Sequence, residues 1–150
     1  MIAEPKILND YPKEMVIKPF FKETWTILNC VHTHNFELLS SICDDDFGII
    51  DINTEGGSEI IRNREGWENW FKSLFEKLDE MEAKTWSEIT NYEALMSDEM
   101  GYGVVDFDQF FIHNGKALKF SVIATIIWKF FNGEWKESRY HSSLIKIHEI

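Results

Sequence analysis

Two Asn-Gly pairs constrain the second half of this chain more than any other feature of its sequence. They stand at positions 114–115 and 132–133, and each lies between runs of apolar or alternating residues. Asn-Gly favours a two-residue hairpin turn because both central residues of that turn need a positive φ. The sequence therefore predicts three consecutive antiparallel strands joined by these two turns.

The length of the turns also decides which residues share a face of these strands. With two-residue turns, Trp128 faces Glu137 and Ala124 faces His141, and directly opposed residues point to the same side. A longer turn would reverse the faces. The face that we expect the rest of the chain to cover carries Val105, Phe107, Gln109, Phe111, Leu118, Phe120, Trp128, Glu137, Arg139, His141 and Ser143.

Helical periodicity is confined to the first half of the chain. Phe21, Trp25 and Leu28 recur at the spacing of one helix face, and the apolar residues between positions 64 and 78 do so without a gap. Asn35 and Asn63 are suited to cap a short second helix and this long third helix. Between these two helices, FGIIDIN (47–53) and SEIIR (58–62) are typical of strands.

This order of elements predicts an α+β fold. We expect three helices of the N-terminal half to pack on the concave face of a curved antiparallel sheet. We expect one domain over residues 1–150, with residues 1–17 as an N-terminal extension, because no linker or internal repeat divides the chain.

Composition limits the classes of partner. Asp and Glu exceed Lys and Arg by 26 to 15, and the net charge of −11 disfavours nucleic acid and anionic membranes. The longest apolar stretch, at 120–131, is too short to span a bilayer. Cys30 and Cys43 form neither a disulfide framework nor a metal motif, so we interpret them as free thiols in a reducing cytoplasm.

From about Phe20 to Ile147 the chain resembles the nuclear transport factor 2-like superfamily, especially its SnoaL-like branch. The resemblance is carried by DDDFGIID at 44–51, by IRNREGW at 61–67 and by the closing hairpin from Ala124 to Ser143. It implies a cone-shaped, cystatin-like barrel that encloses an apolar cavity, commonly in a homodimer. The family includes ketosteroid isomerases, dehydratases and polyketide cyclases, and also non-catalytic association domains.

The match to the ketosteroid isomerases is partial. Asp51 corresponds to their catalytic base. Their oxyanion hole also needs a tyrosine on the first helix and an acid on a late strand, but residues 19–31 contain no tyrosine and residues 123–131 contain no acid. Because an enolate without such donors is poorly stabilised, we do not expect steroid isomerase activity.

Asp51 and His141 are the candidate acid/base pair. Histidine titrates near neutral pH, and a carboxyl group that points into apolar surroundings has a raised pKa. Two alternatives stay open at this point. His141 can be a hydrogen-bonded core residue, and Asp51 can face water.

Five further residues are candidates for contact with a ligand. Trp25 and Trp128 offer flat apolar surfaces, and Gln109 offers a weaker polar contact. Arg139 can hold a ligand carboxylate, or it can pair with Glu137 at the mouth of the cone.

Metal and cofactor sites are not expected. The His32-Thr33-His34 segment lacks the neighbouring ligands that complete a zinc site. The sequence also contains no phosphate loop and no nucleophile motif.

Two functions fit these observations. The first is a protein that binds a small apolar or aromatic metabolite in the cone, with proton-transfer chemistry of the isomerase, dehydratase or cyclase type. The alternative is a non-catalytic dimerisation or association domain with a filled cone. It would use the apolar residues expected on the outer sheet face: Val104, Phe110, Ile123, Ile127 and Tyr140.

Overall fold

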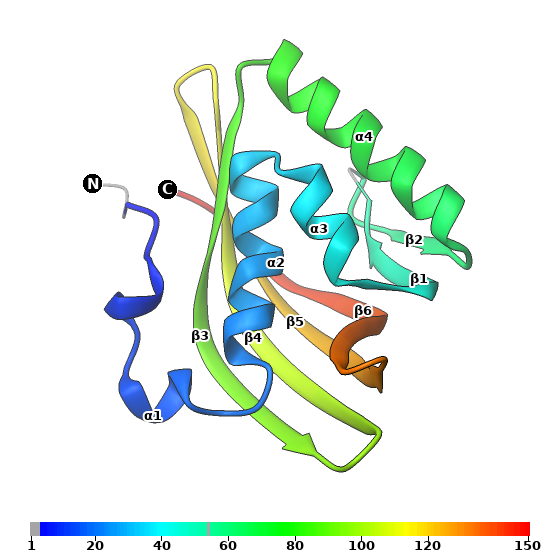
Figure 1. The fold of residues 1–150 in the computed structure, drawn as a ribbon. Helices are drawn as coiled ribbons and strands as arrows, with labels where there is room; N and C mark the ends of the chain where they lie inside the picture. Colours follow the sequence, from blue (N-terminus) through cyan, green and yellow to red (C-terminus); the bar gives the residue numbers. More distant parts are fainter. Residues whose placement is uncertain (1–3, 54) are drawn as a thin grey trace.

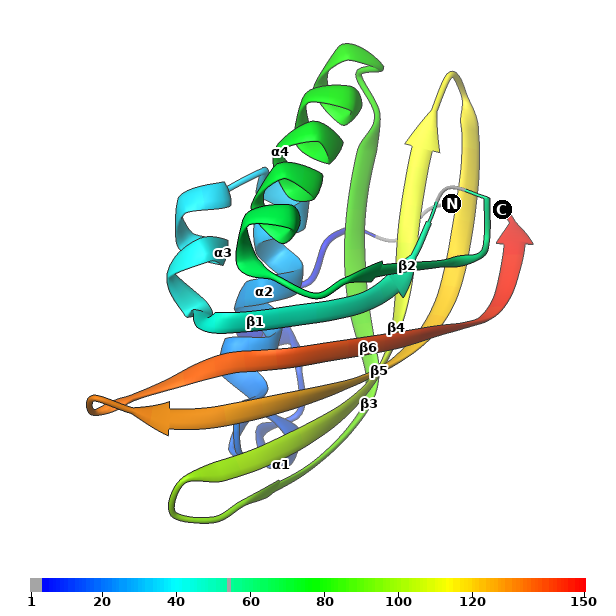
Figure 2. The same cartoon turned by 90° about the vertical axis from the view of Figure 1, so that its right-hand side faces the viewer.

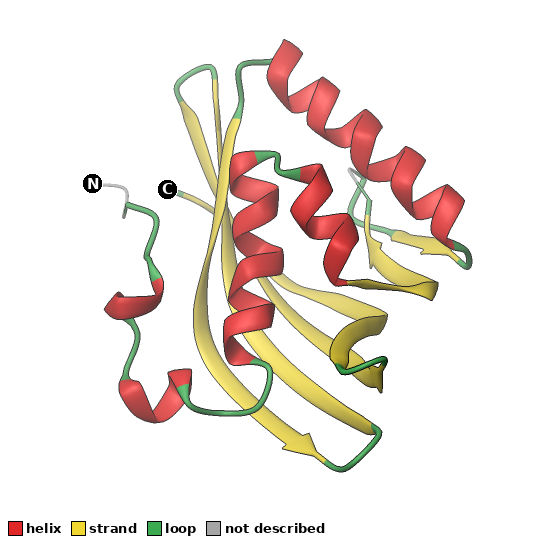
Figure 3. Cartoon of the chain, viewed as in Figure 1, coloured by secondary structure: helices red, strands yellow, loops and turns green. Residues whose placement is uncertain are grey.

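The three predicted helices are present in the computed structural model, which describes residues 4–53 and 55–150 (Figures 1 and 3). They are α2 (Phe21–Thr33), α3 (Phe36–Ile42) and α4 (Arg64–Glu80), and two short helical turns, η1 (Leu8–Asp10) and α1 (Lys13–Val16), precede them. Asn35 and Asn63 cap α3 and α4 as predicted. Their side chains accept hydrogen bonds from the backbone N–H groups of Leu38 and Gly66.

Six strands form one curved sheet. They are β1 (Cys43–Ile52), β2 (Ser58–Ile61), β3 (Lys84–Met96), β4 (Met100–His113), β5 (Lys116–Phe131) and β6 (Glu134–Glu149). Their order in space is β2-β1-β6-β5-β4-β3, with β2 and β3 at the two edges, so the sheet is open and does not close into a barrel (Figure 2).

The sheet is antiparallel as predicted, except at one pair of strands. All neighbours are antiparallel except β1 and β6, which run parallel. Strand β1 joins the sheet from the other half of the chain, so no hairpin sets its direction relative to β6.

Both Asn-Gly turns have the predicted two residues. Asn114, Gly115, Asn132 and Gly133 all have positive φ, between 50° and 79°. In the first hairpin the predicted register is confirmed along the whole length of the strands, from His113 opposite Lys116 to Met100 opposite Lys129.

The second hairpin follows the predicted register only as far as Glu137. Trp128 faces Glu137 as expected, but the next pair is Ile127 with Arg139, so Ser138 is an extra residue in β6. Such a β-bulge reverses the faces beyond it. His141 consequently faces Thr125, and Ala124 faces Ser142. The prediction that Arg139, His141 and Ser143 lie on the covered face was therefore wrong.

Helices α2, α3 and α4 lie on the concave side of the sheet (Figure 2). We call this covered side of the sheet the inner face. The core between the helices and this face is rich in aromatic rings, and Trp67, Trp128, Phe21, Phe47 and Tyr92 are all buried. These rings fill much of the space that the curvature of the sheet creates.

The segment before α2 runs along the edge strand β3 (Figure 1). The Tyr11 hydroxyl accepts a hydrogen bond from the backbone N–H of Ile89 at 3.0 Å, and Lys18 Nζ donates to the backbone carbonyl of Tyr92 at 2.9 Å. Lys6 pairs with Glu88 at 2.8 Å. The N-terminal segment thus covers backbone groups that an edge strand otherwise leaves unpaired.

Both cysteines are free and buried. Over residues 4–53 and 55–150, none of the helices has the length and apolar character needed to cross a membrane.

Candidate functional site

Five polar side chains gather on the inner face where β1 and β6 lie next to each other. Cys43 and Asp51 come from β1, whereas Glu137, Tyr140 and Ser142 come from β6. The parallel pairing of these strands sets Cys43 opposite Glu137 and Ile49 opposite Tyr140. We call these five residues the inner cluster.

Asp51 is held through one oxygen of its carboxyl group. The Ser142 hydroxyl donates to Oδ1 at 2.7 Å, and the backbone N–H of Ile52 donates to the same atom at 2.8 Å. Burial raises the pKa of Asp51, while these two hydrogen bonds favour the ionised form and oppose the rise. Because both bonds use Oδ1, Oδ2 is the oxygen left to accept a proton.

Glu137 is only 2% exposed, although it is an acid. Burial raises its pKa to about 8. The nearby charge of Asp51 adds to the rise, and the hydrogen bond from Cys43 opposes it. The Cys43 thiol donates to Glu137 Oε1 at 3.5 Å. At neutral pH Glu137 is therefore mostly a neutral carboxylic acid, which can donate a hydrogen bond.

Tyr140 pairs with Ile49 of β1, two residues before Asp51, and lies three residues after Glu137 on β6. It is partly exposed. Burial is the main cause that raises its pKa well above the usual value. The charges of Asp51 and Glu137 act in the same direction, and Ser142 opposes them. The phenol therefore keeps its proton and is a second neutral donor. Its predicted place on the outer face was wrong because the bulge at Ser138 turns it inward.

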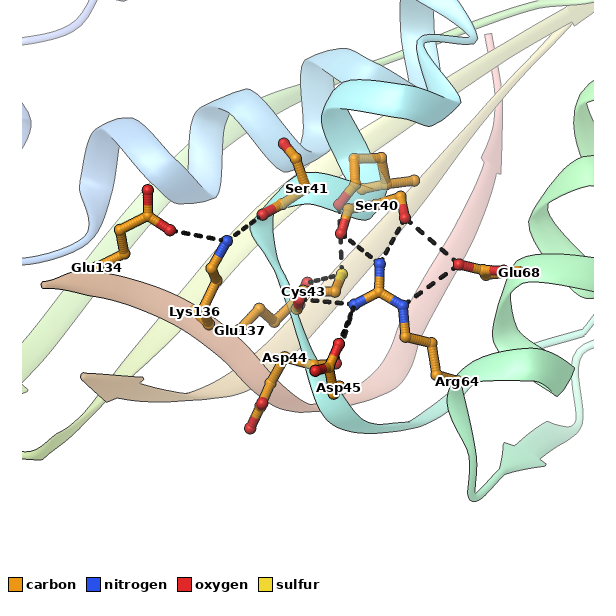
Figure 4. A network of polar contacts seen from close by, with 11 residues as sticks. Ser40, Ser41, Cys43, Asp44, Asp45, Arg64, Glu68, Glu134, Lys136 and Glu137 are labelled. Carbon is orange, nitrogen blue, oxygen red and sulfur yellow. Dashed lines mark hydrogen bonds and ion pairs between the residues drawn. The ribbon is translucent and has the colours of Figure 1, made fainter. Parts of the chain in front are cut away.

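Arg64 fixes the strand that carries Cys43 and Asp51 (Figure 4). Its Nη1 donates to the backbone carbonyl of Cys43 at 2.8 Å, and its Nη2 donates to that of Ser40 at 2.7 Å. Its Nε donates to Glu68 one helical turn further along α4, at 3.3 Å. One guanidinium thereby joins the start of α4, the end of α3 and the start of β1.

His141 and Arg139 lie outside the inner cluster. Both are exposed, and the bulge places them on the outer face. Arg139 donates to the backbone carbonyl of Asp46 and lies 3.4 Å from the Asp46 carboxylate. The predicted pairing of Arg139 with Glu137 is therefore replaced by contacts with Asp46, and Glu137 bonds to Cys43.

The other predicted contact residues have different surroundings. Gln109 lies on the inner face as expected, and its Nε2 donates to Thr85 Oγ1 at 3.3 Å. Trp128 is fully buried and stacks on Phe20, with ring centroids 5.3 Å apart. Trp25 Nε1 donates to the backbone carbonyl of Lys6 at 3.3 Å, so its indole faces the N-terminal segment. Asp51 is the only one of the two candidate catalytic residues that belongs to the inner cluster.

Sequence reasoning missed Cys43, Tyr140 and Ser142. A bulge in β6 is what brings Tyr140 and Ser142 to the inner face, and no glycine or proline marks its position. The pattern that follows the bulge contained a usable sign. The large Tyr140 and Leu144 alternate with the charged or polar Arg139 and His141, which is the opposite of the alternation that the turn alone predicts.

Comparison with known proteins shows the fold and leaves the function open. No family model matches the chain, and no curated protein matches its sequence. Many solved structures are similar to it. A type 2 hexachlorocyclohexane dehydrochlorinase superposes with a TM-score of 0.70 and 17% identity, covering 86% of this chain and 85% of that one.

Two other similar structures have different roles. A candidate scytalone dehydratase from Novosphingobium aromaticivorans has a TM-score of 0.69 and 8% identity, over 86% of this chain and 83% of that chain. A calmodulin-dependent kinase II hub homology domain from Chlamydomonas reinhardtii has a TM-score of 0.65 and 15% identity, over 83% of this chain and 95% of that chain. The chain therefore has the same α+β fold as these structures. That fold carries both enzymes and assembly domains.

Proposed function

We propose that this protein binds a small apolar or aromatic carbonyl compound in the cone and catalyses proton transfer through an enolate. The observation that carries the proposal is the inner cluster, which combines one carboxylate base with two neutral donors. Asp51 is the base, and the Tyr140 phenol and the protonated Glu137 carboxyl are the donors. Asp51 and Tyr140 are less completely buried than Glu137.

The two roles need opposite protonation states. Burial raises the pKa of both carboxyl groups, and the difference between them lies in the hydrogen bonds that oppose this rise. Asp51 accepts two hydrogen bonds that stabilise its charge. Glu137 accepts one long bond from a thiol and is almost completely buried. Pairs of acids whose environments separate their pKa values in this way are typical of acid/base sites.

The chemistry follows from these states. Asp51 Oδ2 takes a proton from the carbon next to the substrate carbonyl, and the electron pair moves onto the carbonyl oxygen. Tyr140 and Glu137 stabilise the resulting oxyanion by donating hydrogen bonds. The proton then returns to a different carbon, which gives isomerisation, or the enolate expels a leaving group from the β-carbon, which gives elimination.

The site also changes the interpretation of the missing isomerase donors. The first helix and residues 123–131 still lack the tyrosine and the acid of the ketosteroid isomerases. In this chain a phenol and a neutral carboxyl come instead from one strand, β6. Elimination has additional support, because two similar structures are by name a dehydrochlorinase and a candidate dehydratase.

Isomerisation of β,γ-unsaturated cyclic ketones tests the proposal, because the conjugated products absorb in the ultraviolet. If a ketone of this kind is turned over, Asp51→Asn should lower kcat at least about 100-fold. Tyr140→Phe should lower kcat by roughly 100-fold as well, because an oxyanion donor is lost. His141→Ala is the matched control and should leave the rate unchanged. Turnover that survives in Asp51→Asn contradicts the assignment.

A second candidate function is a non-catalytic association domain. Two observations favour it: the core is filled by buried aromatic rings, and large apolar residues are exposed at the strand ends. One similar structure is a kinase hub domain. In this alternative a second copy of the chain covers the outer face, and the homodimer is the functional unit.

A further inference from the structure

A cavity lies away from the inner cluster, at the opposite edge of the sheet. It has a volume of about 450 Å³, which is within the range of small-molecule sites. The end of α2, the loop before β3 and the first described residues of the N-terminal segment surround it. None of the five residues of the inner cluster lines it. We call this space the outer cavity.

One wall of the outer cavity is apolar. It is lined by Trp86, Ala83, Ile112 and Pro5. The indole ring of Trp86 stacks on Phe110, with centroids 5.2 Å apart and planes inclined by 17°. Trp86 is 7% exposed, and within the described part of the chain its buried Nε1 has no hydrogen-bond partner. A rigid aromatic wall of this kind suits a planar ligand ring.

Two imidazole rings form the polar wall. His32 Nδ1 lies 2.9 Å from the backbone carbonyl oxygen of Thr85, and His34 Nδ1 lies 2.8 Å from Asp79 Oδ1. A carbonyl or carboxylate oxygen only accepts, so each Nδ1 carries a proton. In the neutral ring Nε2 is then an acceptor, and it is the nitrogen left for a ligand. The polar wall can therefore accept a hydrogen bond from a hydroxyl group.

Two charges of opposite sign complete the outer cavity. Lys84 is exposed and, among residues 4–53 and 55–150, forms no ion pair. Glu4 lines the cavity from the N-terminal segment. An ammonium group without a partner attracts a carboxylate, whereas Glu4 repels it. The Asp79 carboxylate is bonded to His34.

We propose that the outer cavity binds a flat aromatic carboxylate that also carries a hydroxyl group. The ring packs against the apolar wall that Trp86 and Ile112 line, the carboxylate pairs with Lys84, and the hydroxyl donates to the imidazole wall. This site is independent of the function proposed for the inner cluster, because the two share no residue.

The indole N–H signals in nitrogen–proton NMR spectra test the proposal and locate the ligand. The probe is 6-hydroxy-2-naphthoate, and Trp86→Phe identifies the Trp86 signal among the six tryptophans. Titration should shift the Trp86 signal and leave that of Trp128 in the core unchanged. A shift of Trp128 with no shift of Trp86 would overturn the proposed location.

Variants and a second probe test the three contacts. Lys84→Met should weaken binding about tenfold or more, since a charge-assisted hydrogen bond is lost. Lys22→Met changes an exposed lysine in the first turn of α2, so it is the matched control and should bind as the wild type does. Glu4→Gln should bind more tightly. Wild-type affinity in Lys84→Met overturns the carboxylate contact, and equal affinity for 2-naphthoate overturns the hydroxyl contact.

Discussion

A neutral carboxylic acid inside a protein stays neutral only while the pH is below its pKa. For Glu137 that limit is about 8, because almost no water reaches the side chain. Asp51 has a raised pKa for the same reason, but two hydrogen bonds to its Oδ1 favour its charge. The division of roles between the two acids therefore depends on hydrogen bonds that individual residues supply, above all Ser142.

The stability of the protein should reveal the proton on Glu137. Between pH 4.5, its ordinary pKa, and about pH 8, the folded chain keeps a proton that the unfolded chain has released. Folding stability must then fall as the pH rises through this window, by at most about 1.4 kcal/mol per pH unit for one group. Glu137→Gln should remove that part of the slope, as measured by urea unfolding at several pH values.

Two comparisons make this test specific to Glu137. Asp51 contributes a slope of the same sign, but it is present in both proteins and cancels in the difference. Glu134→Gln removes an exposed acid from the same strand and should keep the wild-type profile. Parallel profiles of Glu137→Gln and wild type would show that Glu137 is ionised at neutral pH.

At the scale of elements, the sequence predicted what local chemistry determines. Asn35, Asn63 and the two Asn-Gly pairs act through neighbouring backbone groups, and the helix starts and turns that they predict are confirmed. The bulge at Ser138 has no turn or cap residue beside it, and only the alternation of the residues that follow it indicates its position. An error of one residue there exchanged the two faces and moved His141 from the expected site to solvent.

The same limit applied to the prediction of the inner cluster. Glu137 precedes the bulge and was correctly expected on the inner face, whereas the sequence left open whether Asp51 points inward or to water. Tyr140 and Ser142 follow the bulge and were assigned to the wrong face. The parallel pairing of β1 with β6 brings Asp51 to Ser142, which is 91 positions away in the sequence. No residue near either strand indicated this pairing.

Arg64 offers a test of how the elements hold the site in place. Lysine keeps the charge but cannot reach the carbonyls of Ser40 and Cys43 and the Glu68 carboxylate together, because it lacks the forked guanidinium. Arg64→Lys should therefore lower the free energy of unfolding by about 2 kcal/mol. Arg62→Lys, two residues earlier and exposed, should change it by less than about 0.5 kcal/mol. Urea unfolding measures both, and equal effects would contradict the role of Arg64.

For the whole molecule, net charge and exposed apolar surface have opposite effects on self-association. The net charge of −11 repels a second copy. The outer side of the strand ends nevertheless carries large apolar side chains, among them Leu95 at 61% and Phe131 at 67% exposed. Leu95 pairs with Tyr102, which is also exposed, so these residues form a continuous surface with Met100. Apolar surface of this kind is typical of an interaction site.

If this surface forms a homodimer, salt should strengthen the association. Raising the ionic strength from about 0.01 M to about 0.1 M shortens the screening length from roughly 30 Å to roughly 10 Å, which weakens the repulsion and leaves the apolar contact intact. Sedimentation velocity should therefore show a lower dimer dissociation constant at the higher salt concentration. Leu95→Asp should give a monomer under both conditions, while Ile7→Asp, which is exposed on the N-terminal segment, should not. A wild-type monomer at every concentration, or a dimer that Leu95→Asp leaves unchanged, would show that this surface does not join two copies.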